Sequence, residues 1–277
     1  MTKQSKEAEP KEVFIDVYED ASSWPDPKKR LIKYVAFTFV IGWILWGIRA
    51  ALLMTGSLAE TSIPSIVLLV AGFFAPTIAA IAVLPDGPSA EAIKDLFFNH
   101  RSGRTGDWVL LYAVLLVMVM WLSSGIFVEG LTATSLIIVF LCALILCGGN
   151  EEPGWRGIMA PIVESKNPFS VAALLVGIAE AVFYLPFALT GGLSFSIDAI
   201  SLSLTYPELA GMVIFFGYML GAIRKITGSV FYTAILRALT IVSMCIFVFQ
   251  ANITLVICLV VVAGISAFAY NRAVPKE

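Results

Sequence analysis

Two adjacent glutamates, with an arginine close behind them, are the residues of this chain whose types and spacing best suit chemistry. They lie in the sequence GGNEEPGWRG at residues 148–157. Glu152 and Arg156 are four residues apart, so on a helix they share a face and should form an ion pair. Glu151 is five residues from Arg156 and points elsewhere. The spacing predicts one carboxylate held by an arginine and a neighbour left free to act as a general base on water.

The residues around this acidic pair favour a helix that starts there. Gly148 and Gly149 weaken the apolar helix that precedes them. Asn150 is a good N-cap, and Pro153 is tolerated in a first helical turn. We therefore expect a break at the two glycines and a new helix that begins at the glutamates.

The composition is that of an integral membrane protein. Of the 277 residues, 59% are hydrophobic and 14% are charged, and the mean hydropathy is +0.90, whereas soluble domains carry about 25% charged residues. The net charge of −2 gives no basic patch, so we expect membrane lipids and no nucleic acid as partners. The cysteines lie inside apolar runs without a CxxC spacing, which is typical of packed free thiols; they are Cys142, Cys147, Cys245 and Cys258.

Eight apolar segments approach the length of about 20 residues that a membrane-spanning helix needs. The predicted fold class is an all-α, polytopic membrane protein with about eight transmembrane helices. Two of the links are very short, near 129–130 and 250–251, which implies antiparallel neighbours. The predicted segments are 31–54, 64–84, 108–128, 131–148, 169–190, 209–223, 229–249 and 251–270.

The distribution of Lys and Arg predicts the orientation. These residues precede the first segment, follow the second, fourth and sixth, and end the chain, whereas the alternate links carry none. By the positive-inside rule, both termini should be cytoplasmic in a multi-pass protein of the cell membrane. We expect a membrane domain over 31–270, an acidic cytoplasmic segment over 1–30 that could hold an interfacial helix, and a cytoplasmic tail over 271–277. The apolar link 191–208 could dip into the outer interface or form a re-entrant element.

Ionisable residues at membrane depth form a second group of candidates. Arg49, Glu180 and Arg237 lie within the apolar segments. Placing a charge at a helix centre costs roughly 2.5–3.5 kcal/mol, so such residues usually face the bundle interior and find partners. With Arg156, the arginines could balance Glu180 and the acidic pair as a purely structural network. The charges could also line a transport pathway, although the chain shows no paired broken helices in two halves.

The string EEPGWRG resembles the first motif, EExxxR(G), of the CAAX protease and bacteriocin-processing family of intramembrane endopeptidases. This family includes the type II CAAX prenyl proteases. The resemblance implies an eight-helix membrane core over about residues 31–270, in which Glu151 activates water. No histidine or thiolate cluster lies near the glutamates, so we expect neither a metal nor a cofactor.

The second motif of that family is FxxxH, commonly continued as HLP. The matching stretch here is EAVFYLP at 180–186, with Glu180 at the phenylalanine position and Tyr184 at the histidine position. Glu180 and Tyr184 are four residues apart and should share a helical face. Both side chains are therefore expected to point into the same cavity.

The third motif is a histidine followed by an asparagine four residues later. It corresponds to TGSVFYTAILRALTI at 227–241, with Arg237 and Ile241 at these two positions. The one histidine of the chain, His100, lies in the predicted link between the second and third segments and cannot replace either by position. The chain therefore departs from the family at both motif histidines.

The two replacements could still assist a reaction. The hydroxyl of Tyr184 keeps its proton at neutral pH and could donate a hydrogen bond to an oxyanion, and Arg237 could do the same. Alternatively, Arg237 pairs with Glu180 or with Glu151 and fills a former active site, and in the second case it would also weaken Glu151 as a base. Glu152, Arg156 and Glu180 would support the site.

Two functions follow from this resemblance. The first is a glutamate-type intramembrane endopeptidase that acts on membrane-associated or lipidated peptides with impaired or altered catalysis. The second is a non-catalytic relative that binds a membrane peptide or a partner protein as a regulator or an immunity-type factor. Enzyme status depends on what the expected base, Glu151, contacts.

Overall fold

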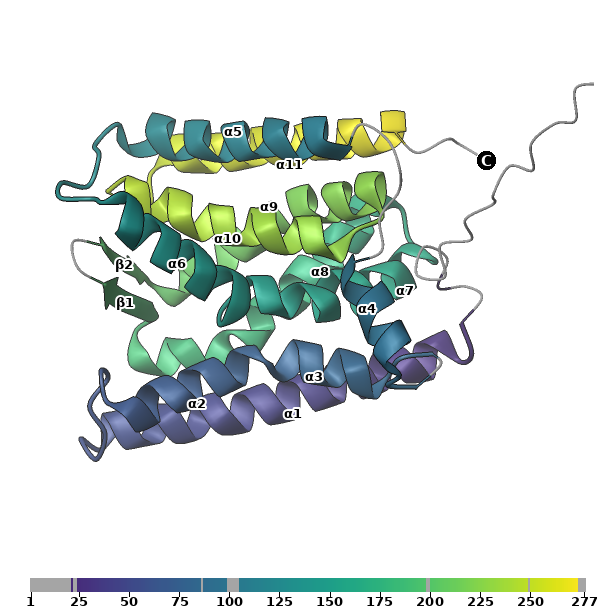
Figure 1. Ribbon diagram of the computed structural model, residues 1–277, viewed down its shortest axis with the longest axis horizontal. Coiled ribbons are helices and arrows are strands. Elements are labelled where there is room, and N and C mark those ends of the chain that lie inside the picture. Colours follow the sequence, from purple (N-terminus) through teal and green to yellow (C-terminus); the bar gives the residue numbers. More distant parts are fainter. Residues whose placement is uncertain are drawn as a thin grey trace, which may run out of the picture.

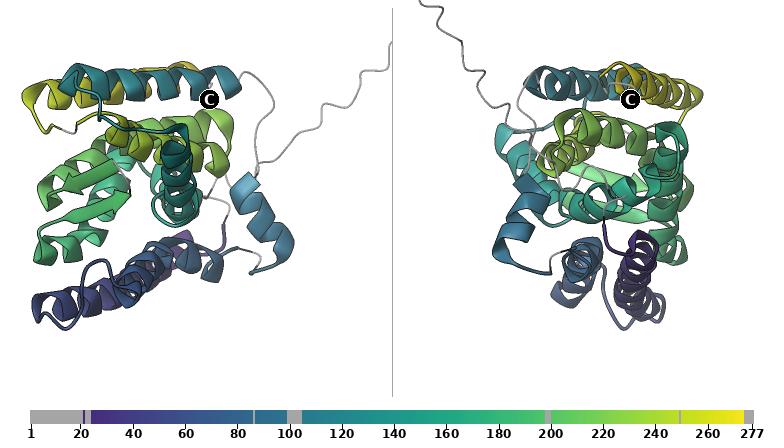
Figure 2. Two further views of the ribbon diagram at one scale, coloured as in Figure 1. Left: turned by 60° about the vertical axis from the view of Figure 1, so that its left-hand side comes forward. Right: turned by 90° about the vertical axis from the view of Figure 1, so that its right-hand side faces the viewer.

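The protein is described by a computed structural model over residues 21, 24–85, 87–98, 105–197, 200–248 and 250–273. Helices make up most of this part, and they are arranged in layers (Figures 1 and 2). One side of the molecule consists of α1 (Pro27–Met54), α2 (Ile63–Phe73) and α3 (Ala75–Ala82). The opposite side consists of α5 (Thr105–Ser124) and α11 (Ile253–Ala273). Between them lie α6 (Ala133–Ile145), α8 (Phe169–Phe183), α9 (Tyr206–Thr227) and α10 (Val230–Ile246).

Each of the eight predicted apolar segments contains a helix. Among the described residues, five helical spans are long and apolar enough to cross a membrane. The pair α2 and α3, bent by 40°, adds a sixth if it counts as one span, and α8 and α10 are apolar but shorter. The mostly helical, membrane-type fold predicted from the sequence is therefore confirmed. A small hairpin of β1 (Leu193–Ile197) and β2 (Ile200–Leu204) departs from the predicted all-α fold class.

The hairpin occupies the link that was expected to dip into the membrane interface. Its strands are antiparallel, with Leu193 opposite Leu204 and Ile197 opposite Ile200. Apolar residues and serine alternate along them, and alternate residues of a strand face opposite sides. One face is therefore apolar, and its Leu202 and Leu204 are buried. This period of two is visible in the sequence and was not recognised in the prediction.

Two predicted links, 129–130 and 250–251, are too short. The chain leaves α5 at Ser124 and enters α6 at Ala133, and it leaves α10 at Ile246 and enters α11 at Ile253. The two links run side by side instead of continuing the helices. The backbone N–H of Val128 donates to the carbonyl of Ile246 (2.9 Å), so backbone groups that a helix would satisfy find partners across the two links.

Local sequence signals set the ends of the helices that carry the site. A capping box of Thr132 and Ser135 starts α6. A second capping box, of Thr205 and Glu208, starts α9. Gly228, with a φ of 70°, ends α9 in the left-handed conformation that glycine adopts without strain.

The two ends of the bundle differ in charge (Figure 1). The start of α1, the amphipathic α4 (Ala90–Phe98) and the end of α11 lie at one end, which carries lysines such as Lys33 and Lys94. The hairpin and the α1–α2 link lie at the other end. The sequence did not predict α4, whose residues were assigned to a link. Most of the predicted segment 1–30, the tail after residue 273 and His100 lie outside the described residues.

Candidate active site

The motif glycines break the chain between α6 and the acidic pair, as predicted. Gly148 has a φ of 100°, which side-chain-bearing residues rarely adopt. A Cβ on Gly149 would lie 2.6 Å from the carbonyl oxygen of Leu144, so this position also requires glycine. A 3₁₀ turn, η2 (Gly149–Glu151), follows the break, and a π-helical segment, η3 (Pro153–Met159), follows the turn. The short α7 (Ala160–Glu164) continues from it.

Asn150 does not cap a helix, which corrects the prediction. Its side-chain Nδ2 donates to the carbonyl of Phe73 (3.1 Å), and its own carbonyl accepts a hydrogen bond from the hydroxyl of Thr77. Phe73 and Thr77 flank the bend between α2 and α3, where Pro76 has no N–H to donate. Asn150 therefore joins the motif to the bent span, and the π-helical turn starts without a side-chain cap.

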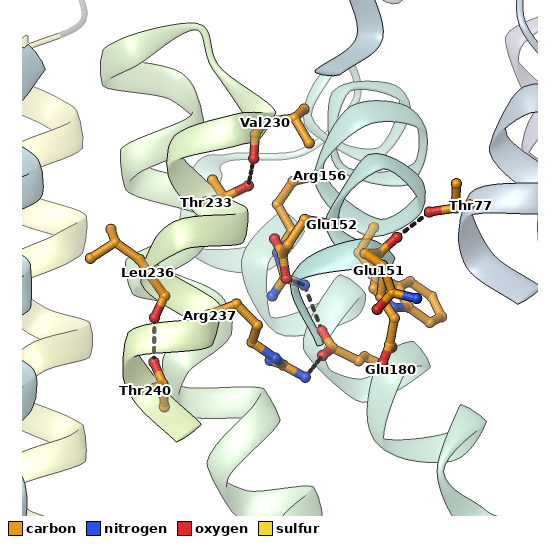
Figure 3. Close-up of polar contacts among 12 residues, drawn as sticks. Thr77, Glu151, Glu152, Arg156, Glu180, Val230, Thr233, Leu236, Arg237 and Thr240 are labelled. Atoms are coloured by element: carbon orange, nitrogen blue, oxygen red, sulfur yellow. Dashed lines mark hydrogen bonds and ion pairs between the residues drawn. The ribbon is translucent and has the colours of Figure 1, made fainter. Parts of the chain in front are cut away.

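A buried ion network lies directly beside the motif (Figure 3). Nη1 of Arg156 lies 3.3 Å from Oε1 of Glu152, the predicted pair, and 2.7 Å from Oε2 of Glu180. Nη2 of Arg237 donates to the other oxygen of Glu180. The four side chains are buried and come from η3, its preceding residue, α8 and α10. Glu180 is thus the common acceptor of two arginines.

Glu151 is not free, in contrast to the prediction. The hydroxyl of Tyr184 lies 2.8 Å from Oε1 and 2.6 Å from Oε2 of Glu151. The indole Nε1–H of Trp155 donates to Oε2 (3.2 Å). Both donors are uncharged. Glu152 and Glu180 accept from arginines. In the described part of the chain, Glu151 accepts hydrogen bonds from neutral donors alone.

The alternative pairings left open by the sequence are resolved by these contacts. Arg237 pairs with Glu180, and its Nη2 also lies 3.3 Å from the hydroxyl of Tyr184. No hydrogen bond or ion pair joins Arg237 to Glu151 in the described coordinates. Arg49 does not join the network, because its Nη2 lies 3.8 Å from Glu60 and its Nε donates to Ser65. The hypothesis that three arginines balance the three glutamates is therefore wrong for Arg49.

An aromatic shell fixes the position of Tyr184. The ring of Trp46 stacks on it, with centroids 5.7 Å apart and an interplanar angle of 20°. Phe183 and Phe187 also contact the tyrosine ring, at centroid distances of 5.5 and 6.1 Å. These side chains are buried and exclude water from that side of the Glu151–Tyr184 pair.

A cavity of about 320 Å³ lies on the open side of the site. Residues of α2, α6, the hairpin, α9 and α10 line it, and most of them are apolar. Glu151, Tyr184 and Arg237 reach its wall, whereas Glu152, Arg156 and Glu180 are not among its lining residues. The arrangement separates the inner residues Glu152, Arg156 and Glu180 from Glu151, Tyr184 and Arg237, which a ligand in the cavity could touch.

These contacts define what the site can do chemically. A carboxylate next to an enclosed cavity can take a proton from water, and a tyrosine hydroxyl or a guanidinium can stabilise a developing oxyanion. In the described part of the chain, no group of three or more His, Cys, Asp or Glu side chains could hold a metal ion. Proton transfer and electrostatic stabilisation are the chemistry that Glu151, Tyr184 and Arg237 offer.

Sequence reasoning missed several residues that complete the site. Trp155 lies four residues after Glu151, the same spacing that identified Glu152 and Arg156, so the helical-face argument could have found it. Trp46 lies far away in the chain and gave no local signal. Gly217 was also missed, although a Cβ there would lie 3.3 Å from Nη2 of Arg156, so its small size accommodates the arginine.

The fold and the site together define a multi-pass helical membrane protein with a buried, glutamate-based site. Residues 133–243 match the family model described as Type II CAAX prenyl endopeptidase Rce1-like. This segment, which is less than half of the chain, is thus similar to the CAAX protease family. The match confirms the family resemblance over a shorter range than 31–270, and it contains all six candidate site residues. Comparison with curated proteins finds no match.

The shared contacts of Glu180 predict unequal effects of substitution on stability. Glu180→Gln leaves two buried guanidinium groups next to each other, whereas Arg237→Met leaves Glu180 still paired with Arg156. We expect Glu180→Gln to lower the free energy of unfolding by about 3–5 kcal/mol, the range for a broken buried ion pair, and Arg237→Met to lower it less.

The double variant Glu180→Gln/Arg237→Met should be more stable than the sum of the single effects predicts. The measurement is unfolding of the full chain in detergent, followed by circular dichroism. Additive effects, or a larger loss for Arg237→Met than for Glu180→Gln, would contradict the assignment of Glu180 as the shared acceptor.

Proposed function

We propose that the protein is an intramembrane endopeptidase of the glutamate type, with catalysis altered from that of the family. The match of residues 133–243 to the Type II CAAX prenyl endopeptidase Rce1-like family model supports a membrane endopeptidase as the class. The observation that carries the proposal is the position of Glu151, at the wall of the cavity and outside the ion network. Its substrates would be membrane-associated or lipidated peptides, whose apolar parts suit the lining of the cavity.

In this proposal, Glu151 takes a proton from a water molecule that then attacks the scissile carbonyl. The water must displace or share the contact that Tyr184 makes with Glu151. Tyr184 then turns its hydroxyl to the developing oxyanion, beside Nη2 of Arg237, which lies 3.3 Å from this hydroxyl in the structure. The C–N bond breaks as the tetrahedral intermediate collapses, and Glu151 returns its proton to the leaving amine. Glu152, Arg156 and Glu180 hold η3, α8 and α10 together and do not contact the reacting atoms.

A non-catalytic function is the second candidate, and one observation favours it. The hydroxyl of Tyr184 reaches both oxygens of Glu151, where an attacking water would otherwise bind. A protein with this arrangement could retain the cavity to bind a membrane peptide or a partner protein, as a regulator or an immunity-type factor. In that case a specific partner should co-purify with the full chain, and the protein should not cleave peptides.

We also propose an eight-span arrangement in the cell membrane with both termini in the cytoplasm. Two observations support this arrangement. The start of α1, α4 and the end of α11 lie at one end of the bundle, which carries lysines, and the chain has eight apolar helical segments (Figure 1). The domain limits would be a cytoplasmic segment over 1–30, a membrane domain over 31–270 and a tail over 271–277.

The orientation predicts the behaviour of epitope tags fused to the two ends of the chain. Added protease should remove both tags from inside-out vesicles and neither tag from right-side-out vesicles, because both ends face the cytoplasm. A tag placed in the 55–62 link should show the opposite pattern. Cleavage of the two terminal tags from different sides would contradict the even number of spans.

Removal of the proposed base tests the peptidase directly. We expect Glu151→Gln to lower the rate of peptide cleavage by roughly 10²–10⁴-fold, the usual contribution of general base catalysis. The measurement is mass-spectrometric detection of products from a panel of lipidated and apolar peptides incubated with the purified full chain.

Glu129→Gln provides the matched control, since Glu129 is exposed and lies in the α5–α6 link, remote in sequence from the motif. It should cleave at the rate of the unchanged protein. Equal cleavage by the Glu151→Gln variant and the unchanged protein would overturn the peptidase proposal, and cleavage by neither would favour the non-catalytic function.

A further inference from the structure

Arg237 reaches the cavity with more hydrogen-bond donors than its protein partners use. A guanidinium has five N–H groups. In Arg237, Nη2 donates to Glu180 and lies near the hydroxyl of Tyr184. Nε and Nη1 make no hydrogen bond within the described residues, although the side chain is only 8% exposed. These two groups are therefore available to an acceptor that is not one of the described side chains.

The unused donors can be satisfied from the cavity, whose wall includes Arg237. Gly148 contributes to this position, because a Cβ there would lie 3.3 Å from Cγ of Arg237 and crowd its stem. Glu152 and Arg156 lie behind Glu180, away from the cavity lining. Arg237 is therefore the guanidinium of the network that a ligand in the cavity can contact.

The remainder of the cavity offers little to a polar ligand. Its lining includes Leu69, Val139 and Val213 from three different helices. Two hydroxyls also line it, but each already donates inside the protein: Ser194 to Glu60 (2.7 Å) and Thr240 to the carbonyl of Leu236 (2.8 Å). A peptide backbone enclosed there would leave polar groups without partners, whereas an acyl chain needs none. The volume of about 320 Å³ suits a small ligand.

We propose that this cavity binds a long-chain fatty acid, with its carboxylate accepting from Nη1 of Arg237 and its acyl chain along the apolar lining. The unused donor of Arg237 and the apolar wall together select an amphiphile with one carboxylate end. This occupant lies against Glu151 and Tyr184, so it would compete with any substrate for the same space. The inference does not depend on whether the protein cleaves peptides.

The charge of Glu151 distinguishes the fatty-acid proposal from the peptidase proposal. Glu151, Glu152 and Glu180 outnumber Arg156 and Arg237 by one, and a bound carboxylate would add to this excess next to Glu151. Removing the charge of Glu151 should therefore strengthen binding of a fatty acid. The same change is expected to abolish cleavage under the proposed function, so the two proposals can fail independently.

The experiment measures displacement of cis-parinaric acid, a fluorescent fatty acid, from the full chain in non-ionic detergent. Competitors are palmitic acid, its methyl ester and an apolar peptide with a free C-terminal carboxylate. We expect palmitic acid to compete roughly tenfold or more better than its ester, as a charge-assisted hydrogen bond would give. Arg237→Met should remove this preference, Glu151→Gln should keep or increase it, and Arg224→Gln, a charge-matched change outside the cavity lining, should leave it unchanged.

The result that would overturn the proposal is equal competition by the acid and the ester, or a preference that survives in Arg237→Met. Displacement by the peptide alone would also overturn it, and would assign the donors of Arg237 to a peptide C-terminus. If Arg237→Met does not fold, the comparison of acid with ester on the unchanged protein and on Glu151→Gln still decides the question.

Discussion

The carboxylate of Glu180, held between Arg156 and Arg237, is the interaction on which the rest of the site depends. Charges in an apolar interior are stable only when they are paired and hydrogen-bonded. By accepting from both arginines, Glu180 ties α8 to η3 and α10. The chain gives these long side chains room with glycines, since Gly217 faces Arg156 and Gly148 faces Arg237.

This network explains why two departures from the family pattern, Glu180 and Arg237, occur together. Glu180 stands where the family has phenylalanine, and Arg237 stands where it has histidine, and these two residues bind each other. Arg237 is held by Glu180 and forms no ion pair with Glu151 among the described residues. The third departure, Tyr184, takes the position of a histidine and remains a neutral partner of Glu151. The same replacements that remove the family histidines therefore leave the acidic residue at the cavity wall outside the ion pairs.

Much of this arrangement could be predicted from the sequence because it depends on local spacing. The helical period places Glu152 beside Arg156, and the apolar runs locate the helices. The contacts of Glu151 could not be predicted, because Tyr184 comes from another helix and its ring is positioned by Trp46, more than a hundred residues away. Asn150 was assigned a local capping role, but its partner is the distant bend at Phe73. The hairpin has a local signal, the alternation of apolar residues with serine, but the apolar composition of the same link also favours a segment in the membrane interface.

The central claim is that Glu151 and Tyr184 form the reacting pair while Glu152, Arg156 and Glu180 are structural. Cleavage and thermal stability of a Tyr184→Phe variant test this claim most directly, since the change removes one hydroxyl and leaves every ion pair intact. Loss of an oxyanion donor typically lowers the rate by about 10²–10³-fold, and we predict a loss of this size with little change in the melting temperature. Cleavage that is unchanged or faster in Tyr184→Phe would contradict the account, because the hydroxyl would then be a block on Glu151 and not a participant in the reaction.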